Sequence, residues 1–270
     1  MAGIMERVFP LQSSLDAIDD RRNSSFSKVP TACIMGPPST MKTAMLMQAA
    51  ITEGAGGGRV LFVAPKKLDS LPPGVHGMPQ ASSSAMNNIT FLYARHTSEL
   101  QGYLASLHLI PAADRPTLII IDELHFYTSP QDCGDAATQM VNIARIISLA
   151  QESAEYCSSG SFNSDLQNNA RSQCSVLVSW TQHTSNVLKS GVFEAFARDF
   201  CHHIWVVKMK NKGNGRDSAE YHLVEQCNNT CTISYSACYM SPVQYLILNQ
   251  VTLEAEEAEL LENSLIMEKK

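Results

Sequence analysis

The stretch from residue 31 to residue 53 constrains the fold most, because a buried strand, a glycine-opened loop and a helix follow one another directly. The apolar run ends in Gly36, four residues intervene, and Lys42-Thr43 opens a segment with helical spacing. This is the arrangement of a phosphate-binding P-loop, in which backbone N–H groups and a helix N-terminus face the phosphates of a nucleotide. One position departs from the pattern, since Met41 stands where the second glycine belongs.

The P-loop interpretation gives each residue of the loop a role. Lys42 neutralises the β- and γ-phosphates of ATP, and the hydroxyl of Thr43 ligates Mg²⁺. Met41 is expected to crowd the phosphates, because glycine allows the closest backbone approach and a positive φ. A chance match is the alternative interpretation of so short a pattern. The predicted cofactor-binding residues are Gly36, Pro37, Pro38, Ser39, Thr40, Met41, Lys42 and Thr43.

A second acidic strand lies at domain distance from the loop. Four aliphatic residues at 118–121 precede Asp122 and Glu123, and Asp122 follows Thr43 by 79 residues. This is the Walker B pattern, in which a strand buried on both faces delivers a carboxylate to the magnesium side of the triphosphate. The alternative is an ordinary buried strand that ends in an acid.

Hydrolysis requires a further group that orients the attacking water. Glu123 is one candidate. The other usual place, after the second strand, holds Pro65 and no acid. Gln182 ends the fifth strand and is a candidate sensor of the γ-phosphate, or else a polar strand cap. With Lys42, Asp122 and Glu123 it completes the predicted catalytic set, and a weak or silent ATPase stays open.

The remaining apolar patterns predict an α/β fold with a mainly parallel central sheet and an antiparallel C-terminal extension. Gly54 is expected to stop the first helix, and 65–88 to form a long loop. The expected strands are 31–36, 60–63, 89–93, 118–121, 176–180, 203–209, 220–226, 231–236 and 243–248. The expected helices are 42–53, 97–109, 135–155 and 191–199, the third with a buried stripe of Ala137, Met140, Val141, Ala144 and Ile147.

The chain is expected to divide into three parts. Residues 1–30 form a flap or a partner contact, with Leu11, Leu15 and Ile18 on one possible helical face. Residues 31–249 form the ATPase core. Residues 250–270 form an acidic helix, whose apolar stripe packs on its own domain or on a partner helix.

Composition limits the partners. The net charge of −6 means that bulk electrostatics does not attract nucleic acid, so a local patch has to do so. The candidate patch is a glycine-punctuated hairpin tip between two strands, and a solvated turn is the alternative. Its basic residues are Lys208, Lys210, Lys212 and Arg216.

The N-terminus and the lack of a long apolar run predict a soluble, intracellular protein. Charged residues interrupt any signal-like stretch near the N-terminus, and no run approaches the roughly 20 apolar residues of a membrane span. The eight cysteines are scattered. The groups 227, 231 and 238 and 201–203 match no common zinc spacing, so reduced thiols are expected.

Taken together, these motifs resemble the RecA-type recombinase core. More narrowly, the chain resembles the SWIM-type zinc finger 7-associated protein 1 family, whose members are divergent paralogues of the eukaryotic strand-exchange recombinase. The resemblance covers about residues 31–210 and is strongest before residue 130. It is carried by 36–43, 59–74, 89–93 with 97–100, Asp122 and Tyr127. The stretch 59–74 is the most specific, because nucleotide chemistry does not demand it.

The resemblance implies a nuclear subunit of a Shu-type complex that pairs with a SWIM-domain zinc-binding protein. It also implies contact with the recombinase and its paralogues, single-stranded DNA binding, DNA-stimulated ATP hydrolysis and promotion of homologous recombination. Lys42, Thr43 and Asp122 match the family's phosphate and magnesium positions, whereas Met41 and Pro65 depart from it. Two rival functions remain: a non-hydrolysing interaction protein with a degenerate site, and a small P-loop kinase. Completion of the site by a neighbouring subunit also stays open.

Overall fold

The computed structural model describes residues 4–10, 29–128, 135–159, 173–182, 197–211, 218–225, 231–240 and 243–253. The strands are β1 (Thr31–Gly36), β2 (Val60–Ala64), β3 (Gly74–Val75), β4 (Ile89–Tyr93), β5 (Leu118–Ile121), β6 (Ser175–Thr181), β7 (His203–Asn211), β8 (Ser218–Glu225), β9 (Cys231–Met240) and β10 (Val243–Leu253). The α-helices are α2 (Lys42–Ala55), α3 (Ser83–Met86), α4 (Thr97–Ser106) and α6 (Ala136–Ser159). Short 3-10 helices are η1 (Ile4–Arg7), η2 (Leu107–Leu109), η3 (Ala112–Asp114) and η4 (Leu124–Thr128).

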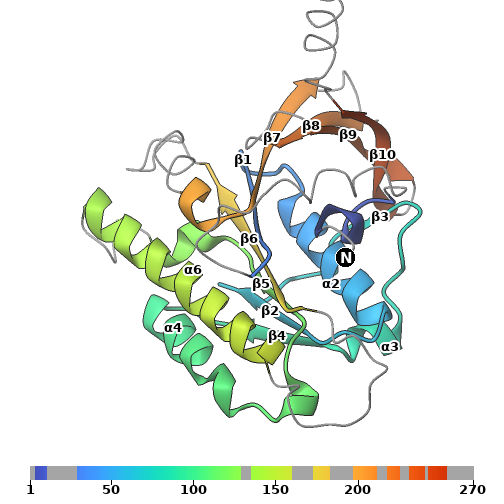
Figure 1. Ribbon diagram of the computed structural model, residues 1–270. Coiled ribbons are helices and arrows are strands. Elements are labelled where there is room, and N and C mark those ends of the chain that lie inside the picture. Colours follow the sequence, from blue (N-terminus) through green and yellow to red (C-terminus); the bar gives the residue numbers. More distant parts are fainter. Residues whose placement is uncertain are drawn as a thin grey trace, which may run out of the picture.

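The strands of the described residues join one 10-stranded sheet in the order β3-β10-β9-β8-β7-β1-β6-β5-β2-β4. The six strands from β7 to β4 are parallel. Strands β1, β2, β5 and β6 are buried along their whole length, since helices cover both faces of the sheet. Figure 1 shows α4 and α6 on one face and α2 on the other.

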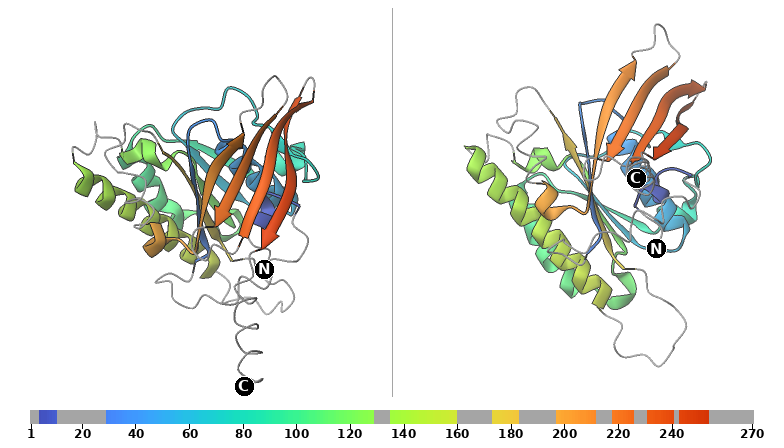
Figure 2. Two further views of the ribbon diagram at one scale, coloured as in Figure 1. Left: turned by 90° about the horizontal axis from the view of Figure 1, so that it is seen from above. Right: turned by 45° about the horizontal axis from the view of Figure 1, so that its top comes forward.

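The C-terminal strands change the direction of the sheet. Strand β7 is parallel to β1 but antiparallel to β8, and β8, β9 and β10 continue as an antiparallel meander. The meander curls over the α2 side of the molecule, and the views in Figures 1 and 2 agree on this. Its inward side chains join the core around α2, among them Tyr221, Leu223, Ile233, Tyr235 and Leu246. The predicted α/β fold class, with a mainly parallel central sheet and an antiparallel C-terminal extension, is confirmed.

Three predicted boundaries are wrong. Helix α2 continues to Ala55, so Gly54 lies inside it, where a Cβ would approach the Ala85 carbonyl oxygen to 2.6 Å. The glycine therefore serves packing rather than termination. The predicted loop at 65–88 contains β3 and α3, which are too short to show a periodic pattern. Strand β10 runs to Leu253, so the helix predicted for 250–270 does not begin at residue 250, and residues 254–270 lie outside the described part.

The buried face of helix α6 overlaps the predicted stripe only in part, since Ile147 is buried and Met140 packs against the core as predicted. Ile143, Ile146 and Ile147 are fully buried, whereas Val141 is 56% exposed and Ala137 is exposed as well. The N-terminal half of the helix carries apolar residues on more than one face, so spacing alone does not separate its buried positions from its exposed ones. The helix predicted at 191–199 lies mostly outside the described residues, of which 197–200 are helical.

The N-terminal segment contributes to the core around α2. Met5, Val8 and Phe9 are buried there, while Leu11, Leu15 and Ile18 lie outside the described residues. The described cysteines are free thiols, and no group of three or more potential metal ligands occurs among the described residues. Within the same part of the chain, no helix is long and apolar enough to cross a membrane.

Candidate nucleotide site

The loop from β1 to α2 begins where two strands approach each other closely. A Cβ on Gly36 would lie 2.8 Å from the Cβ of Val207 in the neighbouring strand β7. A Cβ atom in a protein essentially never lies within 3.0 Å of another non-bonded heavy atom, so β1 needs glycine at its end. The glycine thus lets the loop leave the sheet beside β7.

Met41 adopts the backbone conformation that the missing glycine would adopt. It is the N-cap residue of α2, with φ 61° and ψ 21°, and Ser39 also has φ 61°. A residue with a Cβ pays about 1–2 kcal/mol for this left-handed conformation. The Met41 side chain packs against the core cluster around α2 and also lines the loop's cavity. The loop therefore keeps the path of a P-loop at the cost of local strain.

The loop presents unused backbone donors. Within the described part of the chain, the N–H groups of residues 39–44 donate no hydrogen bond, and the first helical bond runs from Met45 N to Met41 O at 3.1 Å. Pro37 and Pro38 carry no N–H. A run of free N–H groups at the N-terminus of a 14-residue helix is suited to an anion.

Lys42 lies beneath the loop. Its Nζ donates to the carbonyl oxygen of Gly36 at 3.1 Å, to that of Pro37, and to Thr40 Oγ1 at 3.1 Å. Burial lowers the pKa of Lys42 to about 8, although the charges of Asp122 and Glu123 oppose that shift. The ammonium group is thus held at the loop with reduced hydration.

Thr43 and Asp122 meet across the sheet edge. Thr43 Oγ1 donates to Asp122 Oδ2 at 2.8 Å, and Ser179 Oγ donates to Oδ1 at 2.6 Å. The backbone N–H of Glu123 also donates to Oδ1 at 3.0 Å. Burial raises the pKa of Asp122, while the hydrogen bonds from Ser179, Thr43 and Glu123 and the charge of Lys42 lower it.

Glu123 and Gln182 lie at the same sheet edge. Glu123 has φ 52°, and its backbone N–H also donates to Ser179 Oγ at 2.9 Å. Its partly exposed side chain lines the loop's cavity. The backbone N–H of Gln182 donates to Gly36 O at 2.9 Å, but Thr181 rather than Gln182 lines the cavity.

The loop encloses a cavity of about 370 Å³ with Asp122, Glu123, Thr181 and two prolines of the β2–β3 connection, Pro72 and Pro73. The hydroxyl of Thr43 and the carboxylate of Asp122 are hard oxygen donors of the kind that Mg²⁺ takes together with substrate phosphates. The free N–H groups and Lys42 supply positive potential beside them. The donor set fits a magnesium nucleotide.

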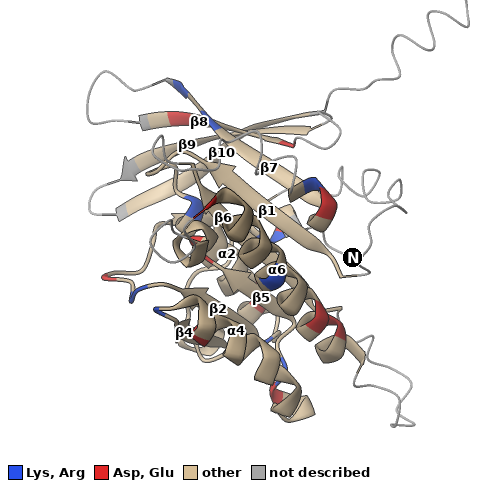
Figure 3. Cartoon of the chain, turned by 90° about the vertical axis from the view of Figure 1, so that its left-hand side faces the viewer, with Lys and Arg blue, Asp and Glu red and all other residues tan. Residues whose placement is uncertain are grey.

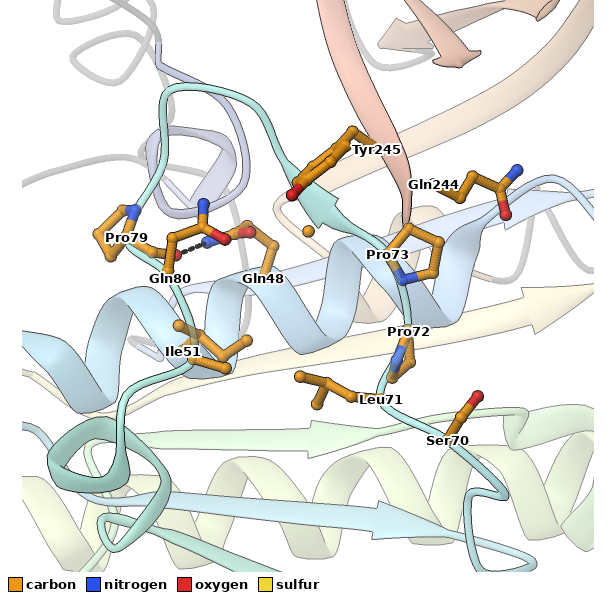
Figure 4. Close-up of a pocket in the computed structure, with 12 residues that line it drawn as sticks. Gln48, Ile51, Ser70, Leu71, Pro72, Pro73, Pro79, Gln80, Gln244 and Tyr245 are labelled. Carbon is orange, nitrogen blue, oxygen red and sulfur yellow. Dashed lines mark hydrogen bonds between the residues drawn. The ribbon is translucent and has the colours of Figure 1, made fainter. Parts of the chain in front are cut away.

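A second cavity, of about 470 Å³, adjoins the first and shares Pro72 and Pro73 with it. Tyr245 of β10 and Gln48 of α2 face it in Figure 4. Gln48 is fixed, because its Nε2 donates to Pro79 O at 2.9 Å and its Oε1 accepts from Val75 N at 2.9 Å.

The predicted basic patch is only partly described. Lys208 and Lys210 are exposed on β7, directly after Val207, and Lys210 pairs with Glu220 of β8 at 3.3 Å. Figure 3 shows how basic and acidic positions are distributed over these strands. Lys212 and Arg216 lie outside the described residues.

Sequence reasoning missed three residues of this site. Ser179 interrupts the apolar run 176–180 within β6, and a buried polar side chain in such a run indicates a fixed hydrogen-bond partner. Tyr221 and Tyr235 donate to the carbonyl oxygens of Ser39 and Thr40, at 3.5 and 3.0 Å. No local sequence pattern predicts these two contacts, because the residues of each pair are separated by 182 and 195 positions in the sequence.

No protein-family model matches the chain. Human ATPase SWSAP1 is 34% identical over 99 residues, which are 36% of this chain and 42% of the human protein. Mouse ATPase SWSAP1 is 32% identical over 113 residues, which are 41% of this chain and 39% of the mouse protein. Over that part, the chain is homologous to ATPase SWSAP1. The resemblance expected from the sequence is thus confirmed for the matched part.

The match to SWSAP1 covers about two-fifths of the length of either curated relative. Among solved structures, the flagellar accessory protein FlaH from Methanocaldococcus jannaschii is similar, with a TM-score of 0.46 and 10% sequence identity. That similarity covers 88% of this chain and 97% of FlaH.

Proposed function

We propose that the chain is an ATP-binding, RecA-paralogue-like subunit that acts in recombinational DNA repair. The observation that carries the proposal is the hydrogen bond from Thr43 to Asp122 beside a loop of free N–H donors. Homology to ATPase SWSAP1 supports the same class of protein. An interaction protein with a decayed site would have no need to keep these polar groups together.

The described residues suggest how ATP and Mg²⁺ are held. The N–H groups of 39–44 and the Lys42 ammonium bind the phosphates, while Thr43 and Asp122 hold the ion. A bound Mg²⁺ would neutralise part of the negative charge of the phosphates. The adjoining cavity, walled by Pro72, Pro73 and Tyr245, takes the base and ribose.

Turnover is proposed to be weak and to be stimulated by DNA. Glu123 is the carboxylate that lines the cavity beside Asp122, so it is the group proposed to orient water. Pro65 leaves the end of β2 without an acidic residue. The strained Met41 lowers the fraction of molecules whose loop is ready to bind nucleotide.

The finer parts of the function rest on the homology. We propose a nuclear protein that forms a heterodimer with a SWIM-domain zinc-binding protein in a Shu-type complex and contacts the recombinase and its paralogues. Single-stranded DNA is proposed to bind at Lys208 and Lys210, with Lys212 and Arg216 completing the patch. Apart from the buried Met5, Val8 and Phe9, residues 1–30 are proposed as a partner contact, and so is the acidic segment after β10.

Nucleotide titration of the purified chain tests the proposal. We expect saturable ATP binding that magnesium strengthens and that Lys42→Ala abolishes. Absence of saturable binding in the unsubstituted protein would leave the pure interaction protein as the better account. Phosphate transfer to a small molecule, with indifference to single-stranded DNA, would favour the P-loop kinase. Co-purification with a SWIM-domain protein tests the partnership separately.

A further inference from the structure

Two stacked tyrosines of the antiparallel meander reach the P-loop. The rings of Tyr221 and Tyr235 lie 5.2 Å apart at an interplanar angle of 18°. Tyr235 is fully buried, and its hydroxyl donates to Thr40 O at 3.0 Å; Tyr221 makes a longer contact of 3.5 Å with Ser39 O. The ring of Phe9 packs on Tyr235 at 5.7 Å. The tyrosine hydroxyls are thus held by rigid, buried rings.

These contacts fix the orientation of two peptide groups. In a trans peptide the C=O and N–H bonds point in opposite directions. Tyr235 holds the carbonyl of the peptide that joins Thr40 to Met41, so the Met41 N–H points away from the tyrosine. Tyr221 contacts the carbonyl of the peptide that joins Ser39 to Thr40, so the Thr40 N–H points away from Tyr221. Both N–H groups belong to the set of free donors in the loop.

The same peptide carries the strain of the loop. Met41 has φ 61°, a conformation that glycine adopts freely and that residues with a Cβ avoid. Without an external hold, rotation of the peptide between Thr40 and Met41 would return Met41 to a favoured conformation and turn its N–H elsewhere. Among the described residues, the hydrogen bond to that carbonyl comes from Tyr235.

We propose that Tyr235 is a positioning residue that holds Met41 in the left-handed conformation, and that Tyr221 supports it by stacking. The tyrosine pair compensates for the methionine that replaces the second glycine. The link to nucleotide affinity rests on the proposed function, whereas the link to loop conformation does not. The competing account is that Tyr235 is an ordinary buried tyrosine whose hydroxyl has found an acceptor.

Binding measurements separate the two accounts. Loss of one buried hydrogen bond corresponds to a change of about two- to tenfold. We expect Tyr235→Phe to weaken ATP binding by about that factor in the native background. When Met41→Gly is also present, the same change is expected to cost less than about twofold, because glycine holds the conformation alone. An equal loss in both backgrounds would overturn the proposal.

Melting of the ligand-free protein tests the tyrosine independently of any nucleotide. Met41→Gly and Met41→Ala lose the same side-chain packing, but only glycine relieves the strain. With Tyr235 present, we expect the Met41→Gly protein to melt about 2–4 °C above the Met41→Ala protein. With Tyr235→Phe added to both variants, the difference between their melting temperatures is expected to fall below half of its value with Tyr235 present. An unchanged difference would also overturn the proposal.

Ser153→Ala is the matched control. Ser153 is buried on the opposite face of the sheet, and its hydroxyl donates to Leu104 O at 2.8 Å. Removing that hydroxyl is expected to lower the melting temperature without changing ATP affinity. The difference in melting temperature between the Met41→Gly and Met41→Ala proteins is also expected to stay the same. If the unsubstituted protein binds no ATP, the proposed function fails, while the melting comparison still decides the role of Tyr235.

Discussion

Thr43 and Asp122 are joined by a hydrogen bond of 2.8 Å, although 79 residues separate them in sequence. The bond links the first turn of α2 to the residue after β5, and β6 lies between β5 and β1. Carboxyl ends of parallel strands meet at one edge of the sheet, so β1, β5 and β6 deliver their following residues to the same place. The hydroxyl and carboxylate are thereby preorganised before any ion arrives.

Asp122→Asn is expected to weaken binding of magnesium ATP at least about tenfold, because it removes a charged magnesium ligand. Binding of ATP without magnesium is expected to change little. Isothermal calorimetry with and without the ion measures both. Asp135→Asn is the control, since Asp135 caps Thr138 N at the start of α6 and asparagine caps equally well. Equal losses with and without magnesium would remove Asp122 from the ion site.

Proton uptake is expected when ATP binds near pH 8. The pKa of Lys42 is lowered to about 8, so a substantial part of the side chain is neutral there and must be protonated to pair with phosphate. Affinity is therefore expected to fall as the pH rises from 7 to 9. Calorimetry in two buffers of different ionisation enthalpy measures the uptake. Lys42→Arg keeps its charge throughout, so an equal uptake by that variant would contradict the assignment.

Tyr245→Ala is expected to weaken ATP binding about fivefold or more, because an aromatic wall of the adjoining cavity is lost. Affinity for inorganic triphosphate, which lacks a base, is expected to stay the same. Competition titrations with the two ligands give both values. A parallel loss for triphosphate would show that the second cavity does not receive the base.

Neutralising Lys208 and Lys210 to glutamine is expected to weaken single-stranded DNA binding and to flatten its salt dependence. Each phosphate contact contributes about 0.7 to the slope of log binding constant against log salt concentration, so losing two contacts should reduce that slope by about 1.4. Glu220→Gln is expected to act oppositely, since it releases Lys210 from its ion pair. Substituting the exposed Arg95 and Arg145 by glutamine removes the same charge elsewhere. An equal effect of that control would point to net charge rather than to a patch.

Gly54→Ala and Gly102→Ala form a matched pair of helical substitutions. The new Cβ would lie 2.6 Å from the Ala85 carbonyl oxygen in α2, whereas nothing lies within 4 Å at Gly102 in α4. We expect Gly54→Ala to lower the free energy of unfolding by about 1–3 kcal/mol through overpacking. Gly102→Ala is expected to raise it by about 0.5–1 kcal/mol. Urea unfolding measures both, and a stabilised Gly54→Ala protein would refute the packing role.

The elements that could be predicted are those whose signal is local. The strands at 31–36 and 118–121 are unbroken apolar runs, and each is followed directly by the residue that carries chemistry. Strand β3 and helix α3 have 2 and 4 residues, too few for a period to emerge. The apolar spacing around Val251 predicts a helix, but Val251 pairs with Ile233 of β9 and therefore lies in a strand.

The site was predictable only on the side that the P-loop motif defines. Lys42, Thr43 and Asp122 follow from spacing and strand order. Ser179 reaches Asp122 from 57 residues away, and Tyr235 reaches Thr40 from 195. The first contact depends on the pairing of β6 with β5, and the second on the curl of the antiparallel meander over α2. No local pattern encodes either arrangement.

The left-handed Met41 has a consequence for recognising proteins of this kind. A search that demands glycine before the Lys-Thr pair passes over this chain, although its main chain turns as that glycine would. The turn is a property of torsion angles, and a distant ring can enforce it where the residue itself does not favour it. Degenerate loops of this type are therefore better sought by pairing the imperfect motif with an aromatic residue far along the chain.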